Sequence, residues 1–336
     1  MARTLSVKDA INEAIAQEMS RDPSIYIMGE DIAGGAGNPR FESKSGLGGA
    51  YGVTGGLVER FGRGRVIDAP ISETAFLGMG LGAAFAGLRP IIEIMYADFI
   101  GVCYDQLLNQ IAKFFFMYGG KKPVPLVLRM PCGAGFRAGP EHSQTLYPLF
   151  ASIPGLKVVT PSNAFDAKGL MVRAIRDNDP VVFLEYKRLY LRECEVPEEG
   201  YEIPFGKAVV KRAGEDVTIV GVHRMVNEAM TAAEELEEAG ISAEVIDPRT
   251  ISPLDVDTIL ESVRKTGRLV IADESYPRFS LASDISAIVC ERAFAHLKAP
   301  IARVLPPHTH IPFSAGLEDA WSPDSKKIVA CVLSNR

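Results

Sequence analysis

The sequence predicts an α/β protein with two doubly wound domains, and three observations support this fold class. Its 336 residues exceed the usual size of a single hydrophobic core. Short apolar runs alternate with helical stretches, which is typical of parallel strands joined by crossover helices. A charged stretch rich in Pro and Gly, from residue 188 to residue 215, interrupts this alternation. We therefore expect a first domain over residues 1–190, a linker over residues 191–215 and a smaller domain over residues 216–336.

The first domain begins with a predicted helix. Ser6 can cap this helix, and Asp9 stands three residues later, as in a capping box. The apolar residues that follow recur at helical spacing. Six short apolar runs are typical of buried parallel strands, at 25–29, 65–69, 89–96, 124–130, 156–161 and 180–186. Helical stretches at 75–87, 101–117 and 164–177 lie between them.

The second domain repeats this alternation on a smaller scale. The apolar run "VTIVGV" at 217–222 predicts its first strand, and a helix over 226–239 follows, ending at Gly240. Further strands are expected at 242–247 and 268–274, and a helix at 281–297. These elements predict a second, smaller parallel sheet.

The composition and charge exclude several classes of function. Hydrophobic residues make up 47% and charged residues 23% of the chain, as in an ordinary soluble globular protein. A net charge of -6 offers no basic surface to a nucleic-acid backbone, so we expect no nucleic-acid partner. The N-terminus lacks the apolar core of a signal peptide, and no apolar run reaches the roughly 20 residues of a membrane span. We expect a cytoplasmic protein with no membrane role.

Cysteine and histidine give little sign of a structural metal or disulfide framework. The five cysteines are widely scattered and none belongs to a C-x-x-C pair. His308 and His310 could face one metal ion from an extended strand, but no third His or Cys lies nearby and prolines at 306, 307 and 312 suggest an irregular loop. We therefore do not expect a transition-metal site there.

The stretch "RVIDAPISETAFLGMGLGAAFAGLRP" at residues 65–90 contains a glycine pattern with two interpretations. Gly78, Gly80 and Ala83 spell G-x-G-x-x-A, which in an NAD-dependent dehydrogenase would form a dinucleotide-binding turn. The predicted strand, however, ends near Ala69, too early to run directly into Gly78. We favour the alternative that the glycines let a helix pack closely against the sheet.

Glu73, in the same stretch, is a candidate functional carboxylate. It lies where a strand leaves the sheet and a helix begins, at the edge where α/β proteins bind ligands. Its neighbours Ile71, Phe76 and Leu77 are apolar, and such surroundings raise a carboxyl pKa and let the acid share a proton with a ligand nitrogen. Alternatively, Glu73 is only a first-turn acid that the helix dipole favours. The residues alone leave both interpretations open.

Longer segments carry a resemblance to a known family. They are "DAPISETAFLGMGLGAAFAGLRPIIEIMYADF", "PCGAGFRAGPEHSQ", "IPGLKVVTPSNAFDAKGLMVRAIRDNDPVVFLEYKRLY" and "PRTISPLDVDTILESVRKTGRLVIADES". Together they resemble the beta subunit of the thiamine-diphosphate-dependent first component of 2-oxoacid dehydrogenase complexes. That resemblance implies a transketolase-like pyrimidine-binding domain followed by a smaller transketolase C-terminal-like domain. "MGEDIAGGAGNP", "DQLLNQIAKF", "DISAIV" with "AFAHLKAPI", and "PPHTHIPFS" look most like the acetoin dehydrogenase branch.

The resemblance implies a role for three residues. The family's P-I-S-E glutamate, here Glu73, hydrogen-bonds N1′ of the cofactor's aminopyrimidine and favours the imino tautomer, whose nitrogen removes the thiazolium C2 proton. The aromatic residue that packs on the pyrimidine corresponds to Phe99. The family's loop histidine, here His142 of "GPEHSQ", handles substrate intermediates and acyl transfer to a lipoyl group, and a histidine near neutral pKa can move protons at working pH.

The resemblance also implies a monovalent-cation loop. "RAIRDNDP" resembles the loop in which the family holds potassium largely by backbone carbonyls. By position, the ligands are Leu126, Ala174, Ile175, Asp177 and Asp179. Asp179 stands where relatives often carry Asn, which leaves the ion's identity open, and a helix end with solvated acids is the alternative.

Half of the family's cofactor site is absent from this sequence. Thiamine-diphosphate enzymes hold the Mg-diphosphate with a G-D-G motif, and the chain contains none. We expect an alpha subunit to supply it in an α2β2 heterotetramer that cleaves acetoin or a 2-oxoacid and passes the acyl group to a lipoyl-bearing acyltransferase core. The alternatives are an NAD-dependent dehydrogenase that uses Gly78, Gly80 and Ala83, and a non-catalytic scaffold subunit.

Overall fold

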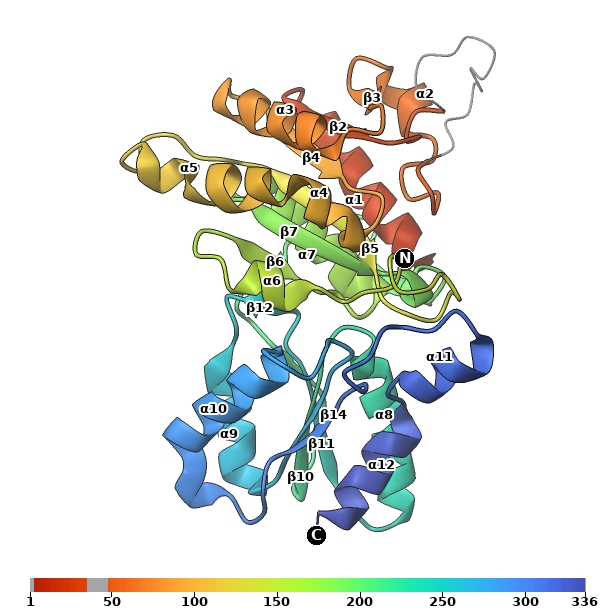
Figure 1. Cartoon of the computed structure of the whole chain (residues 1–336), viewed down its shortest axis with the longest axis vertical. Helices are drawn as coiled ribbons and strands as arrows, with labels where there is room; N and C mark the ends of the chain where they lie inside the picture. The colour runs from red at the N-terminus through yellow and green to blue at the C-terminus, as the bar shows by residue number, and fades with distance from the viewer. Residues whose placement is uncertain (1–2, 35–47, 336) are drawn as a thin grey trace. The chain divides into compact units, whose positions relative to one another are not determined.

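The computed structural model describes residues 3–34 and 48–335, which form two compact α/β units and confirm the predicted fold class (Figure 1). Unit 1 comprises Met1–Cys132, Leu149–Glu185 and Leu189–Pro204. Unit 2 comprises Gly133–Pro148, Tyr186–Arg188 and Phe205–Arg336. The predicted domain 1–190 therefore includes a segment, Gly133–Pro148, that packs with unit 2.

In unit 1, the parallel strands run in the order β6-β7-β5-β4-β2-β3. They are β2 (Ile25–Gly29), β3 (Val66–Asp68), β4 (Arg89–Glu93), β5 (Val127–Cys132), β6 (Lys157–Val159) and β7 (Val181–Tyr186). All six predicted strands are present. β5 begins three residues later than we predicted, because Pro123 and Pro125 have no N–H to donate to a strand ladder. β4 ends at Glu93, before the predicted Tyr96, because the chain turns into a 3-10 helix, η2 (Ala97–Phe99).

The helices of unit 1 are α1 (Val7–Arg21), α2 (Leu57–Phe61), α3 (Glu73–Phe85), α4 (Ile100–Asp105), α5 (Ala112–Met117), α6 (Tyr147–Ala151) and α7 (Ala164–Arg176). Ser6 caps α1 by accepting a hydrogen bond from the Asp9 amide, as predicted. The predicted helix 101–117 is instead three segments, because a π-helical turn, η3 (Gln106–Ile111), separates α4 from α5. α3 packs against β4 and α4, and α1 packs against α7.

In unit 2, five strands run in the order β14-β13-β10-β11-β9. They are β9 (Val209–Arg212), β10 (Val217–Gly221), β11 (Ala243–Asp247), β13 (Leu269–Ala272) and β14 (Ala302–Val304), and only β9 is antiparallel to its neighbour. Figure 1 shows α8 (Met225–Glu238) and α12 (Ser325–Ser334) on one face of this sheet, and α9 (Val256–Thr266) and α10 (Leu281–Ala293) on the other. α11 (Ala315–Trp321), η5 (Phe294–His296) and the short strand β12 (Thr250–Ser252) also belong to this unit.

Several elements of the described chain were not predicted, among them α2, α6, α11 and β14. The expected linker, 191–215, contains β9 and another strand, β8 (Glu193–Val196), which pairs with β1 (Arg3–Ser6). The helices α9 and α12 were also missed, although the sequence holds their signals: Asp255 and Asp324 are N-caps, and Gly267 ends α9 with a φ of 74°. None of the described helices is both long enough and apolar enough to cross a membrane.

Candidate functional site

A cleft of about 1020 Å³ lies in unit 1, where β2, β3 and β4 end. These parallel strands all point their carboxyl ends at this edge of the sheet, which is where α/β proteins place ligands. The cleft is lined by Glu30, Asp31, Ala69, Pro70, Ile71, Ser72, Glu73, Thr74, Ala75, Met95, Phe99 and Val102. Glu73 and Phe99, two of the predicted site residues, are thus brought together.

Glu73 is the first residue of α3, directly after the connection from β3. Its place in the first turn suits the positive end of the helix dipole. Its side chain is nevertheless buried, at 6% exposure, and it lines the cleft. The carboxylate therefore faces a ligand-sized space, which a purely capping acid on the protein surface would not do.

Glu30 is a second cleft carboxylate, which the sequence analysis missed. It follows β2 directly, and its Oε1 atom is buried with no hydrogen-bond partner among the described residues. Burial, and then the charges of Glu73 and Asp31, raise the pKa of Glu30 to about 6. The signal was the acidic pair after a predicted strand, and it becomes informative only once β2 and β3 are known to be neighbours.

The other lining residues of the cleft are mainly apolar. Phe99, the last residue of η2, is half-buried and lines the cleft with Ile71, Met95 and Val102. The ring centroid of Phe99 lies 5.3 Å from that of Tyr96, in an edge-to-face arrangement. This packing holds the ring of Phe99 in place. Acids together with an aromatic wall suit a flat heteroaromatic ligand that carries nitrogen.

The glycines after Glu73 lie inside α3 and do not form a strand-to-helix turn. A Cβ atom added at Gly80 would come within 2.8 Å of Ile92 Cγ1, so this glycine allows α3 to lie close to β4. Gly82 has nothing within 4 Å of an added Cβ. Because a dinucleotide needs the glycines at the helix N-terminus, the pattern of Gly78, Gly80 and Ala83 does not form a phosphate cradle.

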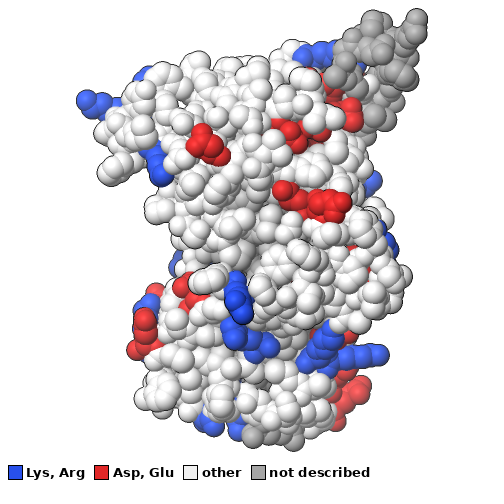
Figure 2. Space-filling model, viewed as in Figure 1, with Lys and Arg blue, Asp and Glu red and all other residues white. Residues whose placement is uncertain are grey.

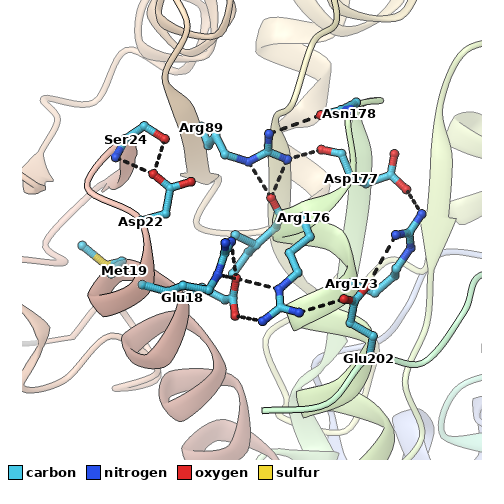
Figure 3. Close-up of polar contacts among 12 residues, drawn as sticks. Glu18, Met19, Asp22, Ser24, Arg89, Arg173, Arg176, Asp177, Asn178 and Glu202 are labelled. Atoms are coloured by element: carbon cyan, nitrogen blue, oxygen red, sulfur yellow. Dashed lines mark hydrogen bonds and ion pairs between the residues drawn. The ribbon is translucent and has the colours of Figure 1, made fainter.

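The backbone oxygens of the predicted cation loop have donors of their own. The Arg89 guanidinium donates to the Ile175 carbonyl at 2.8 and 2.9 Å and also to the Asp177 carbonyl (Figure 3). The Ala174 carbonyl accepts the Asp177 amide at 3.3 Å, and the Leu126 carbonyl accepts the Val181 amide at 2.9 Å. A carbonyl oxygen has two lone pairs, so one that accepts a single hydrogen bond can still bind a metal ion. Such an ion would place a second positive charge beside the Arg89 guanidinium.

Side chains of the same loop are already in ion pairs. Asp177 contacts Lys157 at 2.7 Å and Arg173 at 2.9 Å, and Asp179 contacts Lys157 at 2.9 Å. Burial opposes ionisation of Asp177, but the hydrogen bonds from Lys157 and the Asp179 amide outweigh it and lower the pKa. These carboxylates are therefore held by protein cations.

His142 belongs to unit 2, in the segment Gly133–Pro148, whereas Glu73 and Phe99 belong to unit 1. It is half-buried in an irregular stretch, and its carbonyl accepts a hydrogen bond from the buried Lys187 ammonium. His308 and His310 are both exposed, and no cluster of three His, Cys, Asp or Glu suited to a metal occurs within residues 3–34 and 48–335.

Both units match transketolase families. Residues 3–192 match "Transketolase, pyrimidine binding domain", and residues 206–328 match "Transketolase, C-terminal domain". A solved structure described as "Split gene transketolase, inactive beta4 tetramer" covers 98% of this chain and 98% of its own, with a TM-score of 0.77. At 21% sequence identity, this likeness shows the fold alone.

Curated relatives match along nearly the full length. The beta subunit of acetoin:2,6-dichlorophenolindophenol oxidoreductase from Cupriavidus necator is 56% identical and covers 98% of this chain and 97% of its own. Its counterpart from Bacillus subtilis is 54% identical, covering 99% and 97%. Subunit beta-1 of the mitochondrial pyruvate dehydrogenase E1 component from Arabidopsis thaliana is 44% identical, covering 98% and 88%.

Proposed function

The chain belongs to the family of acetoin dehydrogenase and pyruvate dehydrogenase E1 beta subunits, and on that premise we propose that it is the beta subunit of a thiamine-diphosphate-dependent enzyme. The enzyme cleaves acetoin or a 2-oxoacid and transfers the acyl group to a lipoyl domain. The observation that carries this proposal is the cleft in which the buried Glu73 faces the same space as Phe99. The higher identity to the acetoin enzymes favours acetoin.

The cleft residues fit the aminopyrimidine half of thiamine diphosphate. Phe99 offers a flat face for the ring, and Glu73 and Glu30 can accept hydrogen bonds from its nitrogen atoms. The Oε1 atom of Glu30 has no hydrogen-bond partner among the described residues. When bound, thiamine diphosphate supplies a nucleophilic carbon and an electron sink. The residues of this chain have the simpler tasks of binding, orientation and proton sharing.

Glu73 holds a proton at the pyrimidine N1′ atom in this proposal. Its backbone is fixed by the start of α3, so the carboxyl group approaches the cleft from a rigid element. Its burial removes competing water, and a hydrogen bond to a charged partner is stronger in such a site. His142 is assigned to proton movement during acyl transfer, on the resemblance of its segment to the family.

An alpha subunit supplies the diphosphate half of the site and its Mg, since the chain has no G-D-G motif. The surface of unit 1 supports such a partner. α3 is apolar on all sides after its first two residues, yet Met79 is 59% exposed, and Phe116 on α5 is 87% exposed. Figure 2 shows few charged side chains over α3 and α5. Exposed apolar surface of this extent is typical of a face that a subunit covers.

We also propose that the cation loop binds a potassium ion. A potassium ion would use the backbone oxygens of Leu126, Ala174, Ile175, Asp177 and Asp179, beside the guanidinium of Arg89. No catalytic step is assigned to it. Added potassium that leaves the melting temperature of the assembled protein unchanged relative to sodium would remove this site from the proposal.

Reconstitution with the alpha subunit tests the proposed function. Calorimetry should show no tight binding of Mg–thiamine diphosphate to this chain alone and clear binding to the mixture. The mixture should then acylate a lipoyl domain with acetoin, and we expect less activity with pyruvate or branched-chain 2-oxoacids. Tight cofactor binding by the isolated chain would refute the shared site. Bound NAD(H) would favour the dehydrogenase alternative, and a complex without cofactor would favour a scaffold.

A further inference from the structure

The segment Gly133–Pro148, which carries His142, has almost no regular secondary structure before α6 begins at Tyr147. Its backbone groups therefore need partners outside a helix or sheet. The amides of Ala134, Gly135 and Arg137 donate to two acids of unit 2, Glu274 and Glu318, which lie far along the chain from the segment.

Of the two acids, Glu318 on α11 accepts more hydrogen bonds from the segment with its side chain. Its side chain is fully buried, at 0% exposure. One carboxylate oxygen accepts the Gly135 amide at 2.8 Å. The other accepts the Arg137 amide at 3.2 Å and the Arg137 guanidinium at 2.6 Å. A single buried carboxylate thus accepts three hydrogen bonds from residues 135–137, two of them from main-chain amides. Hydrogen bonds to an ionised acceptor are stronger than those between neutral groups.

Glu274 holds both ends of the segment. Its Oε1 atom accepts the Ala134 amide at 3.0 Å, and its backbone carbonyl accepts the Thr145 hydroxyl at 3.4 Å. Arg224 balances the charge, donating to Oε2 at 2.6 and 2.9 Å. The Glu274 carboxylate therefore also binds a buried arginine, whereas the hydrogen bonds described for the Glu318 carboxylate all come from the segment.

The glycines of the segment make this approach sterically allowed. A Cβ atom at Gly135 would lie 2.1 Å from Arg188 Cδ, and one at Gly139 would lie 2.1 Å from Phe313 Cζ. Both glycines have positive φ, 105° and 75°, and Arg137 between them has a φ of 57°. Glycine adopts positive φ freely, so the strain lies at Arg137, whose backbone conformation is unfavourable without its anchors.

We propose that Glu318 is a positioning residue for the His142 segment, so that unit 2 contributes to acyl transfer by fixing the backbone on which His142 stands. This inference rests on the proposed role of His142. Without the carboxylate, two amides and one nitrogen of the Arg137 guanidinium lose their acceptor, and among the described residues only the ion pair of Arg137 with Asp319, at 2.8 Å, still holds this side chain. The segment then opens more often, and His142 spends less time in its working position.

The test uses the reconstituted complex with Glu318→Ala, Glu318→Gln and a control, Glu291→Gln, which changes an exposed acid on α10 of the same unit. Trypsin cleavage after Arg137, followed by mass spectrometry, reports segment opening directly. We expect cleavage to rise about tenfold in Glu318→Ala, as a loss of about 1.4 kcal/mol of anchoring produces. Acyl transfer should fall by a similar factor, while C2 hydrogen exchange of bound thiamine diphosphate stays unchanged.

Glu318→Gln keeps the size of the side chain and should give intermediate values, so it serves if the alanine variant does not fold. Unchanged cleavage after Arg137 overturns the inference. So does increased cleavage with normal acyl transfer, provided that His142→Ala in the same assay abolishes transfer. If His142→Ala also transfers normally, the role of His142 in the proposed function has failed, and the cleavage data still decide whether Glu318 anchors the segment.

Discussion

The cleft of unit 1 and the His142 segment of unit 2 place their functional side chains by different means. Glu30 directly follows β2, Glu73 begins α3, and Phe99 ends the 3-10 helix η2. His142 stands on an irregular backbone that side chains from distant parts of the sequence hold in place. In the cleft, regular secondary structure does the positioning, and in the segment, individual hydrogen bonds do.

This difference predicts different consequences of mutation. In the cleft, changing a functional residue should alter the chemistry and leave its neighbours in place, because hydrogen-bonded strands and α3 fix the backbone. In the segment, function should be sensitive both to His142 and to residues that never meet a ligand.

The largest effect is expected for His142→Ala. General acid or base catalysis contributes about 100-fold to 10,000-fold to a rate, so acyl transfer to a lipoyl domain should fall by that order. The measurement is a single-turnover transfer assay in the reconstituted complex. His296→Ala, which removes an exposed histidine on η5 of the same unit, is the control and should transfer normally. An unchanged rate in His142→Ala would leave the segment without a catalytic group.

Glu73→Gln tests the cleft. The amide keeps the size of the side chain but cannot share a proton with N1′, so C2 hydrogen–deuterium exchange of bound thiamine diphosphate should slow. A charge-assisted hydrogen bond in a buried site is worth about 2 to 4 kcal/mol, which corresponds to a slowing of about 30-fold to 1000-fold. Cofactor binding should persist, because Phe99 and the diphosphate contacts remain.

The control for Glu73 is Glu59→Gln, since Glu59 is also an acid in the first turn of a helix, α2, but is exposed. If both variants exchange C2 hydrogen at the wild-type rate with full cofactor occupancy, Glu73 is only a helix-start acid. The cleft of unit 1 would then have no chemical role for Glu73.

Gly80→Ala tests the rigidity of the cleft. The new methyl group would meet Ile92 Cγ1 at 2.8 Å and Leu126 Cδ1 at 3.2 Å, and overpacking of this kind costs about 1 to 3 kcal/mol of stability. Thermal denaturation should show a lower melting temperature. Gly82→Ala, on the same helix with open space around its added Cβ, should instead raise stability by about 0.5 to 1 kcal/mol. Equal effects of the two variants would contradict a packing role for Gly80.

The two regions also differ in how far the sequence predicts them. The run "IYIMG" gives β2 with its correct bounds, and the helix expected at 75–87 begins two residues earlier, at Glu73. These positions follow from local apolar patterns and helix signals, which one stretch of sequence contains. Phe99 required the family resemblance, because an aromatic residue after a strand is equally typical of a core.

The rest depends on contacts that no local pattern encodes. Glu30 and Glu73 share a cleft only because β2 and β3 are neighbouring strands. Glu318 meets Gly135 across 183 residues of sequence. A glycine-rich stretch such as "PCGAGFRAGPEHSQ" indicates an unusual backbone, but it does not indicate which acid will satisfy its amides. Sequence periodicity therefore predicts the first region far better than the second.

The smallest expected effect concerns Glu30, whose ionised carboxylate destabilises the cofactor-free protein. Burial and the neighbouring acids raise its pKa from 4.5 to about 6, so between these pH values Glu30 is more often neutral in the folded protein than in the unfolded chain. At pH values above 6 the ionised group destabilises the cofactor-free protein, and this penalty disappears as the pH falls toward 4.5, the unfolded value. Since solvent screening weakens such charge interactions, we expect a penalty of at most about 1 kcal/mol.

Glu30→Gln should therefore raise the melting temperature of the cofactor-free complex by about 2 °C above pH 7 and leave it nearly unchanged near pH 4.5. Glu291→Gln, with its exposed acid in unit 2, should show no such pH dependence. The direction of the effect is what matters. If Glu30→Gln lowers stability at neutral pH, the carboxylate is satisfied by partners in the cofactor-free state, and the cleft is not an electrostatically strained site waiting for a ligand nitrogen. If the gain appears and then vanishes when thiamine diphosphate is bound, the ligand supplies the partner that the described residues do not give to Oε1.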